Sequence, residues 1–176
     1  GRDLRLPELA RALYGIMQRR DLLLYLPDSE MGEALGKLGW SGEVRAARAP
    51  GDYLMLVDAN VGFNKVDAVM ARRLEYQVNI GARGEVTATA LITYEHQGKP
   101  ASGCAQQLPY TEGLTYATLM DACYYDYVRL YAPLGSQLIT ASRHPVPAAY
   151  LISKQPSAGV AETLPAELGK TVFANL

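Results

Sequence analysis

Near the N-terminus, apolar residues recur at the spacing of amphipathic helices. The pattern predicts a helix over residues 6–20, with four side chains on one face: Leu6, Ala10, Leu13 and Met17. A second helix is predicted from an N-cap at Asp28 or Ser29 to Leu38, and Gly39 is suited to end it. Only short extended segments are expected around this helix, at residues 22–26 and 43–49.

From residue 52 onward the pattern changes to that of β-strands. Residues 53–57 are apolar at both odd and even positions, which predicts a strand covered on both faces. Residues 74–80 alternate between apolar and polar side chains, and a turn at 81–84 leads into a return strand over 86–94. The remaining predicted elements are one or two helical turns over 114–122 and strands over 124–132, 136–140, 150–153 and 169–176.

Together these patterns predict an α+β chain in two parts. An N-terminal helical segment with two helices covers residues 1–50, and the turn Pro50-Gly51 separates it from an antiparallel β-rich, sandwich-like domain over 51–176. The chain lacks an initial Met and stops on a segment that reads as the middle of a strand. We therefore expect a fragment of a longer protein, with its β-rich domain truncated at the C-terminus.

Composition narrows the class of protein. Apolar residues make up 49 % of the chain and charged residues 20 %, as in globular domains. The net charge of -1 argues against a nucleic-acid-binding protein, which would carry a basic face. The sequence shows no signal peptide and no apolar run that could cross a bilayer. Its 12 tyrosines suit half-exposed strands, because Tyr combines apolar area with a hydrated hydroxyl.

Polar side chains concentrate just after the first predicted strand. Five of them form the candidate site, a structural corner or ligand loop: Asp58, Asn60, Asn64, Lys65 and Asp67. Oxygen side chains around a Gly are what calcium loops use, so Asp58, Asn60, Asn64 and Asp67 are a calcium candidate. The low acidic count and the spacing depart from an EF-hand, however, and Asx turns use the same residue types. This favours a structural corner in which Lys65 pairs with an acidic neighbour.

The cysteines and histidines lead to no catalytic assignment. Cys104 and Cys123 are either joined by a disulfide, closing a loop of about 20 residues, or are two unrelated buried thiols, and the spacing leaves both open. His96 and His144 are expected to be exposed loop residues. No nucleophile, zinc or phosphate-binding motif accompanies them, so the sequence predicts no catalytic residue, no metal centre and no cofactor.

Three stretches of the chain resemble a known family. They are DYLMLVDANVGFNKVDAVMARRLEYQV, CYYDYVRLYAPLGSQLITAS and ELGKTVFANL, and they carry the patterns D-x-N-x-G-x-N-K and Y-x-R-x-Y-x-P-x-G-S. The second pattern consists of Tyr127, Arg129, Tyr131, Pro133, Gly135 and Ser136. These stretches resemble the C-terminal part of the bacterial domain-of-unknown-function 4012 family. Its members look anchored in the membrane by an N-terminal helix, with the remainder outside the cytoplasm.

The resemblance implies a location and a role. Residues 1–50 would be the end of a preceding α/β region, and an extracytoplasmic location would favour the Cys104–Cys123 disulfide. We expect a non-catalytic structural or binding module of the cell envelope, which meets the membrane only through an anchor outside this sequence and whose partner is an envelope polymer or another surface protein. Two alternatives stay open. One is an accessory part of a phosphotransferase similar to the LytR-CpsA-Psr enzymes, with its catalytic residues upstream. The other is a calcium-dependent carbohydrate-binding module.

Overall fold

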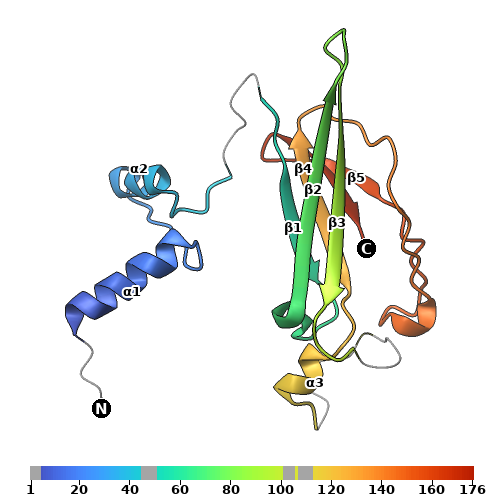
Figure 1. The fold of residues 1–176 in the computed structure, drawn as a ribbon, viewed down its shortest axis with the longest axis horizontal. Coiled ribbons are helices and arrows are strands. Elements are labelled where there is room, and N and C mark those ends of the chain that lie inside the picture. The colour runs from blue at the N-terminus through green and yellow to red at the C-terminus, as the bar shows by residue number, and fades with distance from the viewer. Residues whose placement is uncertain (1–4, 45–50, 101–105, 107–112) are drawn as a thin grey trace. The chain divides into compact units, whose positions relative to one another are not determined.

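The computed structural model describes residues 5–44, 51–100, 106 and 113–176. The chain divides into two compact units, Gly1–Ala49 and Pro50–Leu176. Within the described residues it is an α+β protein with three α-helices, a four-stranded sheet and a two-stranded sheet, and both sheets are antiparallel (Figure 1). The prediction of an α+β chain that begins with two helices is confirmed.

Two helices make up the first unit. Helix α1 spans Leu6–Gln18 and ends two positions before the predicted boundary, because the chain turns at Arg20, whose φ of 61° is left-handed. Helix α2 spans Ser29–Leu38. Its N-cap is Asp28, which accepts a hydrogen bond from the Met31 amide at 2.9 Å, and Gly39 ends it with a φ of 75°. Residues 22–26 form an extended connector rather than a strand, and residues 45–49 of the predicted strand 43–49 lie outside the described residues.

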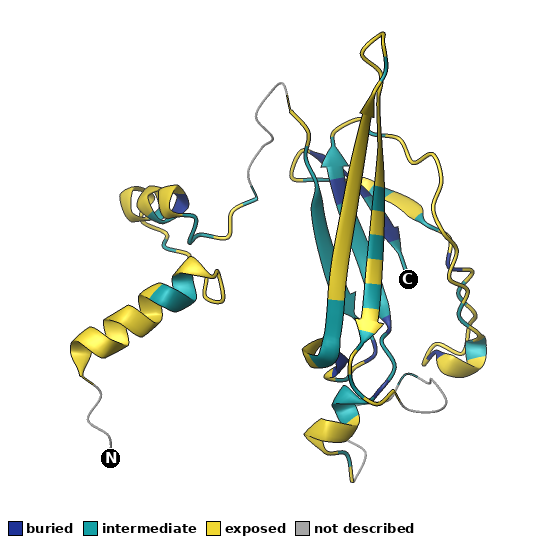
Figure 2. Cartoon of the chain, in the orientation of Figure 1, coloured by how far each residue is buried: buried dark blue, intermediate teal, exposed yellow. Residues whose placement is uncertain are grey.

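The second unit is built on the four-stranded sheet. Its order is β1-β4-β6-β5, and the strands are β1 Met55–Asn60, β4 Asp126–Pro133, β6 Lys170–Asn175 and β5 Glu162–Glu167. Strand β6 is the most enclosed of the four: Val172 is 0 % exposed and Ala174 is 2 % exposed. Figure 2 shows β1, β4 and β6 as buried or half-buried, whereas the edge strand β5 is mostly exposed.

Strand β5 was not predicted from the sequence. It contains Pro165, and a proline inside a candidate strand argues against a central position in a sheet. The structure resolves the conflict because β5 lies at the edge of the sheet and its register shifts between Leu164 and Glu167. The missing amide of Pro165 thus falls at an irregular edge, where it breaks no regular ladder.

A long hairpin forms the second sheet. Strand β2 spans Met70–Ile80 and β3 spans Val86–His96, and the two pair only with each other among the described residues. Figure 1 shows this hairpin in front of the four-stranded sheet, with its turn extending past the end of that sheet. Both strands run longer than predicted, and no residue of either is buried.

The remaining segments are short. A 3₁₀ turn η1 spans Val66–Val69, helix α3 spans Tyr116–Met120 within the predicted 114–122, and a second 3₁₀ turn η2 spans Ala148–Tyr150. The strands predicted at 136–140 and 150–153 are wrong: the first runs without a paired neighbour and the second is a turn. Their apolar residues lie on the loop instead, whose two arms are joined by the bridge between Val146 and Ser157 and by the His144 amide, which donates to the Gly159 carbonyl at 3.2 Å. No helix in the described part of the chain has the length and apolar character needed to span a membrane.

Candidate functional site

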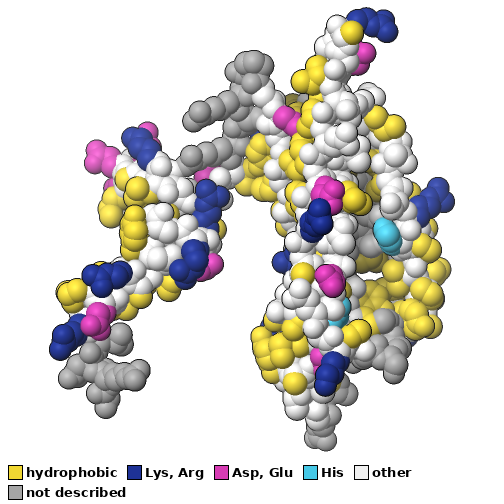
Figure 3. All heavy atoms as spheres, in the orientation of Figure 1, with side chains coloured by type: hydrophobic (Ala, Val, Ile, Leu, Met, Phe, Trp, Pro, Cys, Tyr) yellow, Lys and Arg dark blue, Asp and Glu magenta, His cyan; other side chains and the backbone are white. Residues whose placement is uncertain are grey.

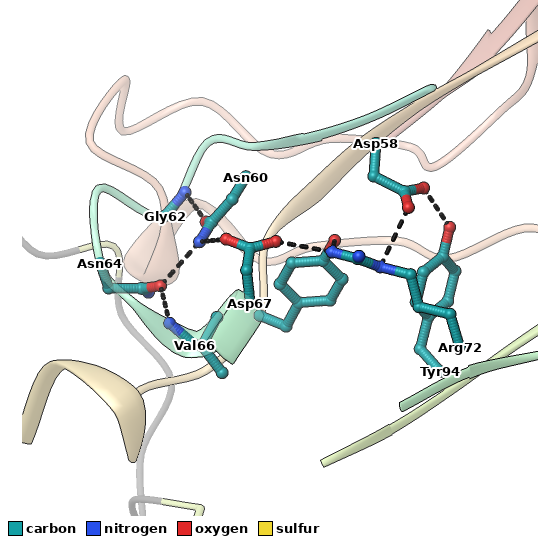
Figure 4. Close-up of polar contacts among 9 residues, drawn as sticks. Asp58, Asn60, Gly62, Asn64, Val66, Asp67, Arg72 and Tyr94 are labelled. Atoms are coloured by element: carbon teal, nitrogen blue, oxygen red, sulfur yellow. Dashed lines mark hydrogen bonds and ion pairs between the residues drawn. The ribbon is translucent and has the colours of Figure 1, made fainter. Parts of the chain in front are cut away.

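The candidate site begins inside β1. Asp58 and Asn60 were predicted in a loop, but both belong to the strand, where their alternate spacing places them on one face of the sheet. Just after the end of β1, the Val61 amide donates to the Tyr125 carbonyl at 2.8 Å. A tight turn then leads into η1, so that Asp67 comes back toward the end of the strand (Figure 4).

Asn60 is the centre of a hydrogen-bonded corner. Its Oδ1 accepts the Gly62 amide at 2.8 Å, which closes an Asx turn. Its Nδ2 donates both to Asn64 Oδ1 at 2.9 Å and to Asp67 Oδ2 at 2.7 Å (Figure 4). A single amide side chain therefore joins the strand, the turn and η1.

Asn64 attaches this corner to a distant segment. Its Nδ2 donates to the Cys123 carbonyl at 3.0 Å, and its Oδ1 also accepts the Val66 amide at 3.2 Å. Val66 is 0 % exposed. The turn therefore buries an apolar side chain, while the polar side chains of the turn bond to one another. These are the contacts of a structural corner, in which Asn side chains satisfy nearby backbone groups.

Arg72, which the sequence analysis did not single out, supplies the positive charge of the site. Its guanidinium lies 3.0 Å from Asp58 Oδ2 and 2.8 Å from Asp67 Oδ1, and it also donates to the Tyr124 hydroxyl at 3.3 Å. That hydrogen bond is the main reason why the pKa of Arg72 is raised. The predicted ion pair of Lys65 is wrong, because Arg72 reaches both carboxylates from β2 while the Lys65 side chain is exposed.

A third carboxylate, which was not predicted, lies beside Asp58. Asp126 begins β4 on the same face, since its partner across the ladder is Asn60. Both carboxylate oxygens of Asp126 are buried and lack a hydrogen-bond partner of good geometry. Burial, and then the charge of Asp58, raise the pKa of Asp126 to about 6, although the Tyr94 and Tyr124 hydroxyls act in the opposite direction.

Two tyrosines complete the contact between the hairpin and the sheet. The Tyr94 hydroxyl of β3 donates to Asp58 Oδ1 at 2.5 Å, and the Tyr94 and Tyr124 rings pack at 5.6 Å between centroids. Burial raises the pKa of both phenols, so they remain neutral donors. We call the group Asp58, Asn60, Asn64, Asp67, Arg72, Tyr94, Tyr124 and Asp126 the polar corner.

The polar corner has little capacity for chemistry on a ligand. The oxygen atoms proposed for calcium accept hydrogen bonds from within the corner, and Arg72 already places a cation between Asp58 and Asp67. Among the described residues, no group of three or more His, Cys, Asp or Glu side chains has the geometry of a metal site. Asp126 has the pKa of a general acid, but its oxygens are buried, and a catalytic acid must reach its substrate.

The second family-like pattern forms a separate row on the opposite face of the sheet. Tyr127 donates to Glu162 at 3.2 Å and Tyr131 donates to Glu167 at 2.7 Å, while Arg129 lies 3.4 Å from the Glu167 carboxylate. These side chains of β4 reach β5 across β6, and they pass over the buried Val172 and Ala174. The pattern therefore ties the edge strand β5 to the inner strand β4 across β6.

The rest of that pattern shapes the turn after β4. Gly135 has a φ of 90°, which favours glycine, and its amide donates to the Thr171 hydroxyl at 2.9 Å. The Ser136 hydroxyl donates to the Pro133 carbonyl at 2.7 Å. Pro133, Gly135 and Ser136 thus form a turn anchored to β6, and none of the three points to a ligand.

Neither histidine belongs to the polar corner, and Cys123 contacts it through its backbone carbonyl. Cys123 is a bonded rather than a free thiol, but Cys104 lies outside the described residues, so their pairing stays a prediction. His96 is half-buried at the end of β3, where its ring accepts the Gly98 amide at 3.1 Å and lies 3.3 Å from the Ala122 carbonyl oxygen. The prediction that His96 is exposed was wrong, whereas His144 is exposed as expected.

Comparison with known proteins adds no relative. No family model, no curated protein and no solved structure matches the chain.

Proposed function

We propose that this chain is a non-catalytic module with a structural or binding role in the bacterial cell envelope, outside the cytoplasm. The observation that carries the proposal is that the polar corner bonds to itself: the Asn60 amide alone accepts one hydrogen bond and donates two. The resemblance to the domain-of-unknown-function 4012 family supports the location. We include three further points in this proposal: the chain belongs to that family, an α/β region precedes it, and its two sheets pack as in a sandwich.

The contacts of the polar corner explain why a structural module would keep these residues. The corner joins the end of β1, η1 and the start of β2, which follow one another in the chain, to the distant segment before β4 through the Cys123 carbonyl. Each such contact fixes the hairpin or the turn relative to the sheet. Hydrogen bonds of this kind contribute about 1 kcal/mol each, and more where a carboxylate accepts. The corner therefore contributes the sum of several hydrogen bonds to the free energy of unfolding.

Thermal unfolding of Asn60→Ala tests the structural role. The substitution removes three hydrogen bonds and leaves Asp67 Oδ2 and the Gly62 amide without their partner, so we expect a loss of about 2 to 3 kcal/mol. Asn79→Ala is the matched control, because Asn79 is exposed on β2, and we expect a change within about 0.5 kcal/mol. Equal melting of the Asn60 variant and the parent chain would refute the structural role.

The same melts, repeated with calcium and after reduction, separate this proposal from its alternatives. We expect no response to calcium, because the oxygen atoms of the corner are already bonded. A rise of several degrees in calcium, abolished by Asn60→Ala, would instead indicate a ligand site. Reduction should cost about 3 kcal/mol if Cys104 and Cys123 close their loop. Protease treatment of intact cells that carry the full-length protein tests the location, and full protection would contradict it.

A further inference from the structure

The β2–β3 hairpin is long but poorly covered. One of its faces is apolar, with Leu74, Tyr76 and Val78 on β2 opposite Ile92, Ala90 and Ala88 on β3. Exposure is similar along β2 at Leu74 (42 %), Tyr76 (37 %) and Val78 (40 %), and it is higher next to the turn, at 59 % for Val86 and 74 % for Ile80. A two-stranded sheet without further strands or a covered face is marginally stable in water.

The contacts with the four-stranded sheet are confined to one part of the hairpin. Arg72 and Tyr94 bond to Asp58 near its base, and the Tyr76 hydroxyl donates to Asp52 at 2.6 Å. Beyond Tyr76 no hydrogen bond or ion pair joins the hairpin to the described part of that sheet. Figure 3 shows this end of the molecule standing clear, with apolar side chains on its visible surface.

The two outer edges of the hairpin differ in character. Strand β2 carries Arg72, Arg73 and Glu75, the kind of charged residues that protect an exposed strand edge from pairing with another chain. Strand β3 contains no charged residue and no proline from Val86 to Tyr94. A long, uncharged edge of this kind is a template for strand addition, so the edge of β3 is the one that a partner would cover.

The hydrogen bonds between β2 and β3 show which backbone groups lie free along the outer edge of β3. At one end the Gly81 amide donates to the Glu85 carbonyl, and at the other the Gln97 amide donates to the Val69 carbonyl. In an antiparallel pair, alternate residues bond inward and the residues between them point outward. Since odd-numbered residues bond within the hairpin, Ala88, Ala90 and Ile92 direct their amide and carbonyl groups away from β2.

We propose that a second copy of this chain pairs with this edge, β3 against β3, antiparallel about a twofold axis near Ala90. In that register Ala88 faces the partner's Ile92 and Thr87 faces the partner's Thr93. Glu85 faces the partner's Glu95 at each end, and these like charges limit the overlap to the residues between them. Every residue within the overlap is uncharged, and the apolar faces of two hairpins join into one four-stranded surface. The contact is isologous and closes on itself, as twofold dimers do.

A proline placed at the outward-facing edge tests the proposal on the 176-residue chain. Ala88→Pro removes one outward amide per chain, hence two hydrogen bonds per dimer, and should weaken association about 30-fold in sedimentation equilibrium. The control is Val78→Pro: Val78 lies directly opposite Ala88 on β2, and its amide faces the other edge. It should leave association unchanged, because a proline is tolerated at an outer edge.

Thr89→Lys keeps the test valid if a proline variant unfolds. Thr89 is exposed on β3, so a lysine there adds the charge that protects natural strand edges and leaves the hairpin folded. Circular dichroism of each variant confirms folding before association is measured. Dimerisation of the parent chain that is weakened by Ala88→Pro or Thr89→Lys, but not by Val78→Pro, supports the proposal. A monomeric parent chain, or a dimer that survives both β3 substitutions, overturns it.

Discussion

Asp126→Asn should stabilise this protein at neutral pH, although it removes a carboxylate from the middle of a polar cluster. The two oxygens of Asp126 are buried and lack good hydrogen-bond partners, and Asp58 lies on the same face of the sheet. Asp58 already has Arg72 and the Tyr94 hydroxyl as partners. An ionised Asp126 is therefore a buried charge next to another negative charge, and burying such a charge without a partner is costly.

The pKa of Asp126 sets the size and the pH range of this effect. Folding raises that pKa from 3.8 to about 6, so the folded state holds the proton more tightly than the unfolded state. Stability therefore falls as pH rises through this window, and the full cost is present above it. A shift of about 2 pKa units corresponds to about 3 kcal/mol. Because Asp126 is only half-buried, solvent screening reduces the expected cost to about 1 to 2 kcal/mol.

Thermal unfolding across this pH range provides the assay. Asn has nearly the shape of Asp and stays neutral, so Asp126→Asn should unfold close to the parent chain near pH 4. It should unfold about 3 to 6 °C higher than the parent chain near pH 7.5. The control is Asp52→Asn, which weakens the bond from the Tyr76 hydroxyl and should not stabilise the chain at any pH. In parallel, the Asp126 carboxyl carbon should titrate near pH 6 by NMR.

Two results would refute this reasoning. A melting temperature of Asp126→Asn that stays below that of the parent chain at pH 7.5 would mean that the ionised carboxylate is stabilised by its surroundings. A titration midpoint near 4 would mean that burial and Asp58 do not raise the pKa. Either result would assign Asp126 to the same charge-balanced network as Asp58 and Asp67.

Two further substitutions test the polar corner. Arg72→Met should destabilise by about 1 to 3 kcal/mol, since it leaves Asp58, whose side chain is 14 % exposed, without its cation. Arg73→Met, which breaks an exposed pair with Glu75, should cost less than about 0.5 kcal/mol, and denaturant unfolding that shows equal losses would contradict the difference. Gly62→Ala should cost about 1 to 2 kcal/mol, because its Cβ would lie 2.6 Å from Asn64 Nδ2 and 2.9 Å from Asn60 Oδ1. A double-mutant cycle should show a smaller loss once Asn60 is Ala, and strict additivity would argue against this clash.

Local rules predicted much of the fold because the relevant interactions are local. The cap at Asp28, the stop at Gly39 and the turn between β2 and β3 depend on residues within a few positions of one another. The strand predicted over 124–132 corresponds to β4, and the alternation of a strand by itself places Tyr127, Arg129 and Tyr131 on one side of it.

Neighbours in the sheet decided what those rules missed. Strand β5 exists despite Pro165 because an edge position beside β6 requires no continuous ladder. The segment 136–140 has strand-like residues but no partner to pair with, and a strand is stable only through its partners. Local sequence contains neither fact.

The same division applies to the polar corner. The sequence alone indicated that Asn60 and Asn64 shape a turn, because Asx side chains bond to nearby backbone amides, but it placed Asp58 in that loop although Asp58 lies within β1. Only the tertiary structure decided that Arg72 rather than Lys65 balances the charge. It also decided that Asp126 lies buried beside Asp58, since strand pairing brings together residues more than sixty positions apart. Charge balance and burial depend on distance in space, and spacing along the chain does not specify them.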